Sequence, residues 1–211
     1  MNMPVPAPRH ALNLPAGSVR AIHVLAIVGL ICAIIMLPVR EDAPHTIPPY
    51  LIYLLFLMLG HYFASHGGTI AAAGEEGRAS PLYLPGGTVR VLIVLALVGC
   101  IGWKLYSDQA NLIKQFEGSL ELLKKEPVLP LIILGGFLIG VIARVIMRGI
   151  GPHAALQDLE AWLSLLALLG ILIAGVIHLI VDTSLEERLY LPIWESFVGG
   201  VVAFYFGARS S

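Results

Sequence analysis

The chain has 211 residues, of which 57% are hydrophobic and only 13% are charged, with a net charge of -1 and a mean hydropathy of +0.85. Because soluble domains carry about 25% charged residues, this composition excludes an ordinary soluble domain and predicts a surface covered by the lipid bilayer. The balanced charge also argues against nucleic acid as a partner, since a basic face usually marks such binding.

Six segments have the length and composition of membrane-spanning helices, each of which needs about 20 mainly apolar residues. They are residues 19–37, 49–66, 88–106, 128–147, 161–181 and 191–208. Pro38 ends the first segment, and Pro49 suits the first turn of the second. The expected fold class is therefore all-α, a polytopic membrane helix bundle of about six transmembrane helices built from repeated helical hairpins.

A short motif opens the first and the third segment. Residues 14–20, Leu-Pro-Ala-Gly-Ser-Val-Arg, return at 84–90 as Leu-Pro-Gly-Gly-Thr-Val-Arg, and between 12–30 and 82–100 eleven of nineteen positions are identical. In each copy the proline stops an incoming helix and the glycine permits a turn. Ser18 and Thr88 are the expected N-caps, because a hydroxyl accepts hydrogen bonds from free backbone N–H groups. The identity favours duplication of a hairpin.

The repeat divides the chain into four parts. They are an N-terminal tail (1–18), a first hairpin with its loop (19–80), a second hairpin (81–158) and a third hairpin (159–211).

The second hairpin contains an amphipathic helix over 111–126, in which apolar residues recur at helical spacing between charged ones. The apolar positions are Leu112, Phe116, Leu120 and Leu123. Three placements remain open: the helix continues the third segment out of the membrane, lies along the interface, or packs on a partner.

Six spans place both chain termini on one side of the membrane. Most of the basic residues on that side lie close to segment ends. They are Arg9, Arg20, Arg78, Arg90, Arg144, Arg148 and Arg209. Cytoplasmic loops are enriched in arginine and lysine, so both termini are expected in the cytoplasm. Arg144 and Arg148, four residues apart, share a helix face and are expected to contact lipid phosphate or a carboxylate.

Arg20 and Arg90 fall in the first turn of their helices, which is the unfavourable end of the helix dipole for a cation. One explanation is snorkelling of the side chains to lipid phosphate. The other is a charge cluster with Asp158 and Glu160 at the cytoplasmic face, because these acids stand near the matching position of the third hairpin.

Three ionisable residues lie about one turn inside the opposite face, namely Lys104, His178 and Glu195. Groups of this kind inside a membrane suggest a polar cluster on a proton or ion path. The simpler explanation is anchoring at the interface beside aromatic residues such as Trp103.

The remaining polar residues of the spans give no pattern of a catalytic or metal site. Cys32 and Cys100 are expected to be small packing residues, since neither has a neighbour at metal-ligand spacing. His23 and His61 are expected to be packing or interfacial residues rather than haem ligands. We expect no cofactor, no metal and no enzymatic activity.

Small residues recur at spacings near four in three segments, which lets helix backbones approach closely. They are Gly135, Gly136 and Gly140, then Gly170 and Ala174, then Gly199, Gly200, Ala203 and Gly207. Packing within the chain and packing between subunits both fit. The last segment has the longest stripe and is the expected subunit contact.

Two short pieces resemble bacterial membrane proteins. The ending Phe204-Tyr205-Phe206-Gly207-Ala208-Arg209-Ser210 resembles the close of small bacterial membrane proteins, including three-helix holin-like proteins, although six spans depart from that pattern. The repeated motif is similar to segments of uncharacterised multi-pass bacterial proteins. The expected function is a non-enzymatic structural or assembly subunit of the bacterial inner membrane, with itself or other membrane proteins as partners. The alternative is a small ion channel or transporter.

Overall fold

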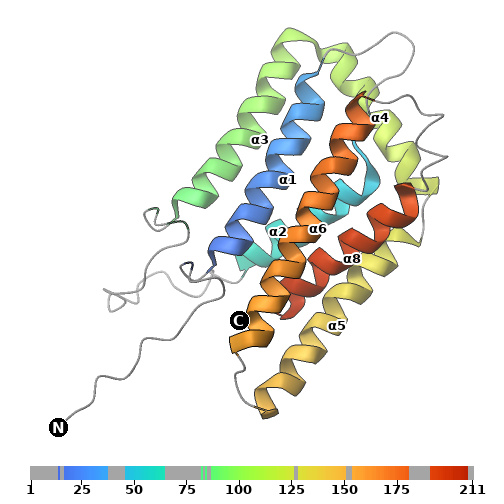
Figure 1. Cartoon of the computed structure of the whole chain (residues 1–211). Helices are drawn as coiled ribbons and strands as arrows, with labels where there is room; N and C mark the ends of the chain where they lie inside the picture. Colours follow the sequence, from blue (N-terminus) through green and yellow to red (C-terminus); the bar gives the residue numbers. More distant parts are fainter. Residues whose placement is uncertain are drawn as a thin grey trace.

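The computed structural model describes residues 14, 17–37, 46–64, 82, 84, 87–125, 128–150, 154–180 and 191–208. Within these ranges the fold is all-α, as expected, with seven helices (Figure 1). They are α1 (Ser18–Met36), α2 (Pro49–Ala64), α3 (Thr88–Ser107), α4 (Gln109–Lys125), α5 (Leu129–Ile150), α6 (Ala154–Ile180) and α8 (Leu191–Ala208).

Four of these helices are long and apolar enough to cross a membrane, namely α1, α3, Leu129–Ile146 of α5 and Asp158–Ile177 of α6. Helices α2 and α8 form where the other two spans were expected. At about 1.5 Å per residue, the 16 residues of α2 extend about 24 Å, which is less than the thickness of the hydrocarbon core.

One helix boundary differs clearly from the sequence prediction. Helix α6 begins at Ala154 rather than at 161, so the expected boundary between the second and third hairpins falls inside it. Its second turn contains Asp158 and Glu160, and the apolar span of this helix includes both of them. Acidic residues therefore do not mark the start of this helix.

The helix starts in the two motif copies correct another expectation. The N-cap residues are Gly17 and Gly87, with φ of 82° and 89°, and neither start has a side-chain capping bond. Ser18 and Thr88 are therefore the first helical residues and not the N-caps. A left-handed N-cap suits glycine because it has no Cβ, and this explains why both copies have glycine there.

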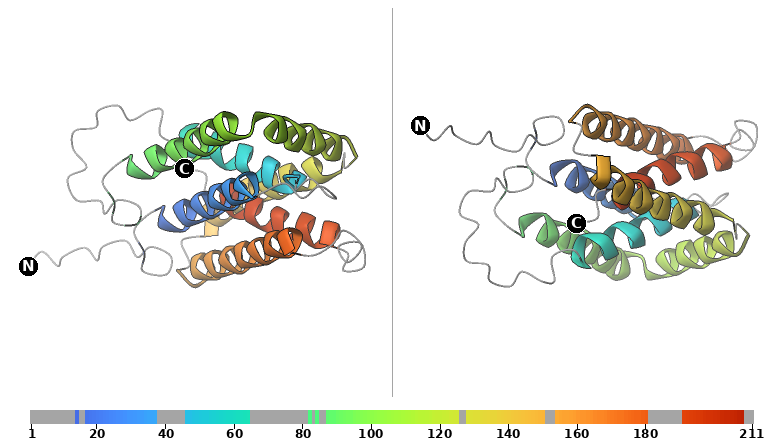
Figure 2. Two further views of the ribbon diagram at one scale, coloured as in Figure 1. Left: turned by 90° about the horizontal axis from the view of Figure 1, so that it is seen from above. Right: turned by 90° about the horizontal axis from the view of Figure 1, so that it is seen from below.

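Figure 1 shows that the starts of α1 and α3 lie at the same end of the bundle as the end of α8. The ring of His23, in the second turn of α1, stacks on the ring of Tyr205 near the end of α8, with 5.6 Å between centroids. We call this end the motif end. In Figure 2, α3 and α4 follow one side of the bundle and α6 follows the opposite side, with α1 and α2 between them.

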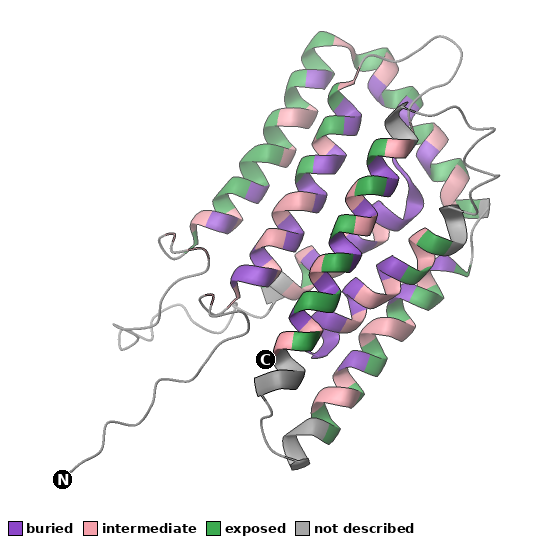
Figure 3. Cartoon of the chain, in the orientation of Figure 1, coloured by how far each residue is buried: buried purple, intermediate pink, exposed green. Residues whose placement is uncertain are grey.

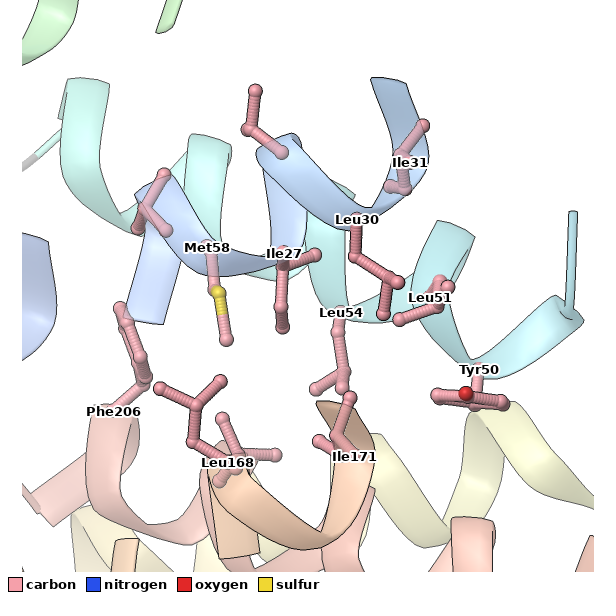
Figure 4. Close-up of a cluster of buried hydrophobic side chains, with 14 of the residues drawn as sticks. Ile27, Leu30, Ile31, Tyr50, Leu51, Leu54, Met58, Leu168, Ile171 and Phe206 are labelled. Atoms are coloured by element: carbon pink, nitrogen blue, oxygen red, sulfur yellow. The ribbon is translucent and has the colours of Figure 1, made fainter. Parts of the chain in front are cut away.

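The core lies where α1, α2, α6 and α8 meet. Ile27 of α1, Leu54 and Met58 of α2, Ile171 of α6 and Phe206 of α8 are all fully buried (Figure 4). Helix α1 is 56% buried along its span, whereas the spans of α3 and α5 are each only 17% buried. Helix α1 is therefore the central helix of the bundle.

Helices α5 and α8 make the closest contact in the molecule. A Cβ placed on Gly136 would lie 2.5 Å from the carbonyl oxygen of Gly200, and one placed on Gly140 would collide with the carbonyl oxygen of Phe204. Residue numbers increase together on both helices, so they run parallel. The stripe of small residues on α8 is thus covered by α5 within the chain, and its expected role as a subunit contact is wrong.

The outer faces of α3 and α5 are apolar and exposed (Figure 3). On α3 they include Leu95 and Val98, and on α5 they include Leu131 and Ile139. Such broad apolar faces are rare on soluble monomers. In a bilayer they are covered by lipid or by other membrane helices, in agreement with the composition.

Helix α4 packs on the protein through one face and leaves two of its expected apolar positions exposed. Leu112, Gln115 and Ser119 are buried, while Phe116 and Leu120 are exposed. The hydroxyl of Ser119 accepts a hydrogen bond of 2.9 Å from the backbone N–H of Ile47, just before α2. This hydrogen bond helps to set which face of α4 packs on the segment that precedes α2. The spacing of apolar residues does not predict such a bond.

Candidate functional site

The polar side chains of α1 form the principal site in the part of the chain described. Ser18, Arg20, His23 and Cys32 each contact another helix or the second motif copy. Three of them lie within the first two turns, at the motif end. We call these four residues and their partners the α1 polar network.

His23 connects α1 to α6. Its Nδ1 lies 2.7 Å from the carbonyl oxygen of Val19, and its Nε2 lies 2.9 Å from the carbonyl oxygen of Ser164. A neutral imidazole has one N–H and donates to only one of these oxygens, whereas an imidazolium donates to both but places a charge in a fully buried position. His23 therefore bonds α6 when Nε2 carries a proton, as in the imidazolium or in the neutral Nε2–H tautomer.

Aromatic rings surround His23 and continue to His61. Phe206 lies edge-on to both histidines, with centroid distances of 6.1 Å to His23 and 5.6 Å to His61. Phe137 of α5 contacts the other side of His61. The two histidines are therefore brought near one another but are separated by Phe206.

The motif arginines both reach the end of α2. Arg20 donates from Nη1 to Nε2 of His61 at 3.2 Å, and because arginine has no acceptor, His61 accepts and carries its proton on Nδ1. The guanidinium of Arg90 lies 5.9 Å from the ring centre of Phe63, a cation–π distance. The two copies thus place the same residue type against the same helix end.

Ser18 joins the two motif copies. Its hydroxyl is fully buried and accepts a 2.9 Å hydrogen bond from the backbone N–H of Leu82. Leu82 has a φ of 57°, a conformation that costs a non-glycine residue roughly 1–2 kcal/mol. The bond to Ser18 holds the chain in this conformation just before the second motif.

Cys32 and Cys100 form a reciprocal contact between α1 and α3. The thiol of Cys32 donates to the carbonyl oxygen of Ala96, and the thiol of Cys100 donates to the carbonyl oxygen of Cys32, both at 3.6 Å. They therefore do more than fill space, because each bonds the neighbouring helix.

This arrangement predicts an intrachain disulfide under oxidation. Treating the membrane-embedded protein with copper phenanthroline is expected to join Cys32 to Cys100, with loss of two thiol hydrogens seen by mass spectrometry of the peptides. Cys32→Ser serves as the control and should abolish the linked peptide. Linkage only between separate chains would contradict the α1–α3 packing.

At the end opposite the motif end, Lys104 is buried and pairs with Asp108 at 3.5 Å. Asp108 also accepts a 2.7 Å hydrogen bond from Nδ2 of Asn111. This bond, together with the ammonium of Lys104, holds the pKa of Asp108 below its usual value. Ionised Asp108 therefore stabilises the connection between α3 and α4 at pH values above the ordinary pKa of aspartate. This stabilisation is lost as the pH falls through the lowered pKa of Asp108 in the folded state.

Gln115 is a buried polar residue at the contact between α4 and the segment entering α2. Among the described residues neither atom of its side-chain amide has a hydrogen-bond partner. We expect Gln115→Met to raise the free energy of unfolding in detergent by about 1 kcal/mol, because it removes an unsatisfied buried group. Ser119→Ala is the matched change, and it should lower stability because Ser119 bonds Ile47. A lower stability of Gln115→Met would contradict this assignment.

The other residues singled out by the sequence are placed as follows. Arg144, Asp158, Glu160 and Glu195 are partly buried, and the side chains of Arg148 and His178 lie outside the described residues. Lys104 stands on α3, whose main neighbours are α1 and α4, whereas Glu195 stands on α8, which packs on α2, α5 and α6. The structure thus gives Lys104 a partner that the sequence analysis did not name.

Arg20 and Glu160 lie at the same level of neighbouring helices. The contact of His23 with Ser164 and the contact of Leu30 with Gly175 show that α1 and α6 run parallel. Arg20 precedes His23 by three residues and Glu160 precedes Ser164 by four. Both side chains therefore stand about one turn from the His23 contact, at the motif end.

Within the described ranges, no group of three or more histidine, cysteine, aspartate or glutamate side chains is placed to hold a metal ion. Comparison of the chain with known protein families, with curated proteins and with solved structures finds no match. Its function is therefore argued from the α1 polar network and from the exposed faces alone.

Proposed function

We propose that this chain is a six-span protein of the bacterial inner membrane that acts as a non-enzymatic structural or assembly subunit. Its partners are the lipid bilayer and further copies of itself or other membrane proteins. The membrane location is supported by the four helices that are long and apolar enough to span a bilayer. Helices α2 and α8 would complete six crossings, and the motif that opens both α1 and α3 supports a repeat of the first two hairpins.

The observation that carries the proposal is the use of polar groups in the bundle. Ser18, His23 and Cys32 each bond a backbone group of another segment, so their hydrogen-bonding capacity serves helix packing. In membranes such bonds fix helix positions, because hydrophobicity does not drive one helix onto another. A rigid bundle with apolar outer faces on α3 and α5 suits a packing partner for other membrane helices.

The test is the mass and composition of the complex extracted from native membranes in mild detergent. A photoreactive residue at Val98 on α3 or at Ile139 on α5 is expected to cross-link to another protein chain. The same residue at Ile27, which is fully buried, is the control and should cross-link only within the chain. A monomer that cross-links only to lipid from both outer positions would overturn the assembly role.

For orientation we propose that both termini are cytoplasmic. The support is the position of Arg20 and Arg90 at the motif end, where α1 and α3 start. A reporter that is active only in the cytoplasm is expected to be active when it is fused to either terminus. A periplasmic signal from either fusion would reverse the topology or change the number of spans.

A small ion channel or transporter is the second candidate, with Lys104, His178 and Glu195 as the residues expected to carry it. The observation in its favour is that the charged Lys104 is only 6% exposed, although its partner is Asp108 and it stands on a helix with other main neighbours than that of Glu195. Ion or proton flux through purified protein in liposomes that disappears with Glu195→Gln would support it. Absence of flux in a preparation that forms a stable assembly would favour the structural role.

We also propose a charge cluster at the motif end, in which Arg20 and Glu160 interact across α1 and α6. Their equal level on parallel helices supports it, whereas Arg90 stands on α3, which packs mainly on α1 and α4. Arg20→Glu is expected to lower the free energy of unfolding by about 1 kcal/mol, as for partly exposed pairs. The double change Arg20→Glu with Glu160→Arg should restore most of that loss. Failure of the double change to restore stability would count against the pair with Glu160 and leave the hydrogen bond to His61 and snorkelling as the roles of Arg20.

A further inference from the structure

We propose that α4 lies in the interfacial region of the bilayer, with Ile113, Phe116 and Leu120 in contact with lipid acyl chains. The inference rests on the proposed membrane location of α3 and α5. It assigns α4 one partner, the lipid surface, and decides among the three placements that amphipathic spacing leaves open.

The connections of α4 exclude a helix that projects into water. A single residue, Asp108, separates α3 from α4, and only residues 126–128 separate α4 from α5. Both neighbours are helices that are long and apolar enough to span. A helix of 17 residues is about 25 Å long, so with both ends held at the ends of spans it crosses that end of the bundle and does not project away from it (Figure 1).

One face of α4 is fixed against the protein. Leu112, Gln115 and Ser119 are buried, and Ser119 bonds the backbone of Ile47. A Cβ on Gly118 would lie 2.7 Å from the methyl group of Thr46, which shows how closely the segment entering α2 approaches. Because this contact fixes the rotation of α4, the direction of its other faces is also fixed.

The remaining surface of α4 divides into an apolar strip and a charged strip. Ile113, Phe116 and Leu120 are 46%, 38% and 56% exposed and are spaced three and four residues apart, so they share one face. The charged strip lies beside it and consists of Lys114, Glu117, Glu121 and Lys124, all exposed. A helix with such adjoining strips lies in an interface, with one strip toward acyl chains and the other toward water.

The charged strip of α4 also indicates which kind of lipid surface the helix contacts. The charged strip has two lysines and two glutamates, so it carries no net charge. Anchors that select anionic lipid are rich in lysine and arginine. The contact of α4 with lipid is therefore apolar, and it should not depend on anionic headgroups.

The experiment uses the full chain in vesicles, with Cys32→Ala and Cys100→Ala so that one spin label can be placed at a time. Labels at 113, 116 and 120 are expected to collide with oxygen, which concentrates in the bilayer, more than with a water-soluble nickel chelate. Labels at 117 and 121 should show the reverse. The same values are expected in phosphatidylcholine vesicles with and without phosphatidylglycerol.

A label at Val98, on the exposed face of α3, separates this inference from the membrane location itself. If position 98 is exposed to oxygen while 113, 116 and 120 are exposed to the nickel chelate, α4 faces water and the inference is overturned. If position 98 is itself exposed to the nickel chelate, the proposed membrane location fails. Labels on the apolar strip that neither reagent reaches would assign the strip to a protein contact and also overturn the inference.

Discussion

Gly140→Ala is expected to lower the free energy of unfolding by about 3 kcal/mol, the upper part of the range for overpacked cores. A Cβ at this position would collide with the carbonyl oxygen of Phe204 and lie 2.8 Å from the backbone nitrogen of Ala208. Backbone atoms cannot turn aside as a flexible side chain does, so α5 and α8 must separate. The measurement is the unfolding midpoint of the purified protein in mild detergent.

Two further glycines make this prediction specific. A Cβ on Gly207 would collide with the carbonyl oxygen of Phe137, so Gly207→Ala should destabilise the protein in the same way. A Cβ on Gly135 would meet nothing within 4 Å. Because alanine is a better helix former than glycine by about 1 kcal/mol, Gly135→Ala should leave stability unchanged or raise it. Equal midpoints for Gly135→Ala and Gly140→Ala would refute the close parallel packing of α5 on α8.

His23→Ile should lower the free energy of unfolding by about 2 kcal/mol, combining a lost hydrogen bond between helices with a lost ring contact. The substitution removes both ring nitrogens and leaves the carbonyl oxygen of Ser164 without its partner from α1. Isoleucine is also the residue at the matching position of the second copy, Ile93, which is fully buried without any such bond. Loss of stability would show that the first copy depends on the histidine.

The variant His23→Phe separates the two contributions. Phenylalanine keeps a ring beside Tyr205 but has no group to donate to α6, so it should recover only part of the loss. Thermal unfolding in the same detergent measures both variants. If both were as stable as the unsubstituted chain, His23 would fill space without joining α1 to α6.

Much of the architecture follows from the sequence because hydrophobicity and helix length are local properties. The composition predicts the membrane, and the apolar segments predict helices at the positions where α1, α2, α3, α5, α6 and α8 occur. The repeated motif predicts matching helix starts, and Gly17 and Gly87 share one left-handed conformation. The sequence prediction started this helix at 161, after the acidic Asp158 and Glu160, whereas α6 begins at Ala154.

The α1 polar network was harder to predict from the sequence because its residues bond to residues far away in the chain. Ser18 has the composition of an N-cap, yet its hydroxyl is used by the backbone of Leu82, far along the chain. Cys32 and Cys100 seemed to be isolated packing residues, yet packing of α1 on α3 lets each thiol donate to a backbone carbonyl of the neighbouring helix. In the sequence, these residues are visible only as a histidine or a serine in an apolar segment. That pattern does not predict which residue each one bonds.

The sequence alone predicted an all-helical chain with helices apolar enough to span a membrane and with two alike helix starts, since these properties reside in composition, periodicity and local backbone chemistry. Only the tertiary structure decided that α1 is central, that the small-residue stripe of α8 is covered by α5, and that α4 rests on the entry to α2. These outcomes depend on which helix faces which. Helix faces are chosen by close backbone approach and by hydrogen bonds between distant residues, and neither leaves a periodic pattern in the chain.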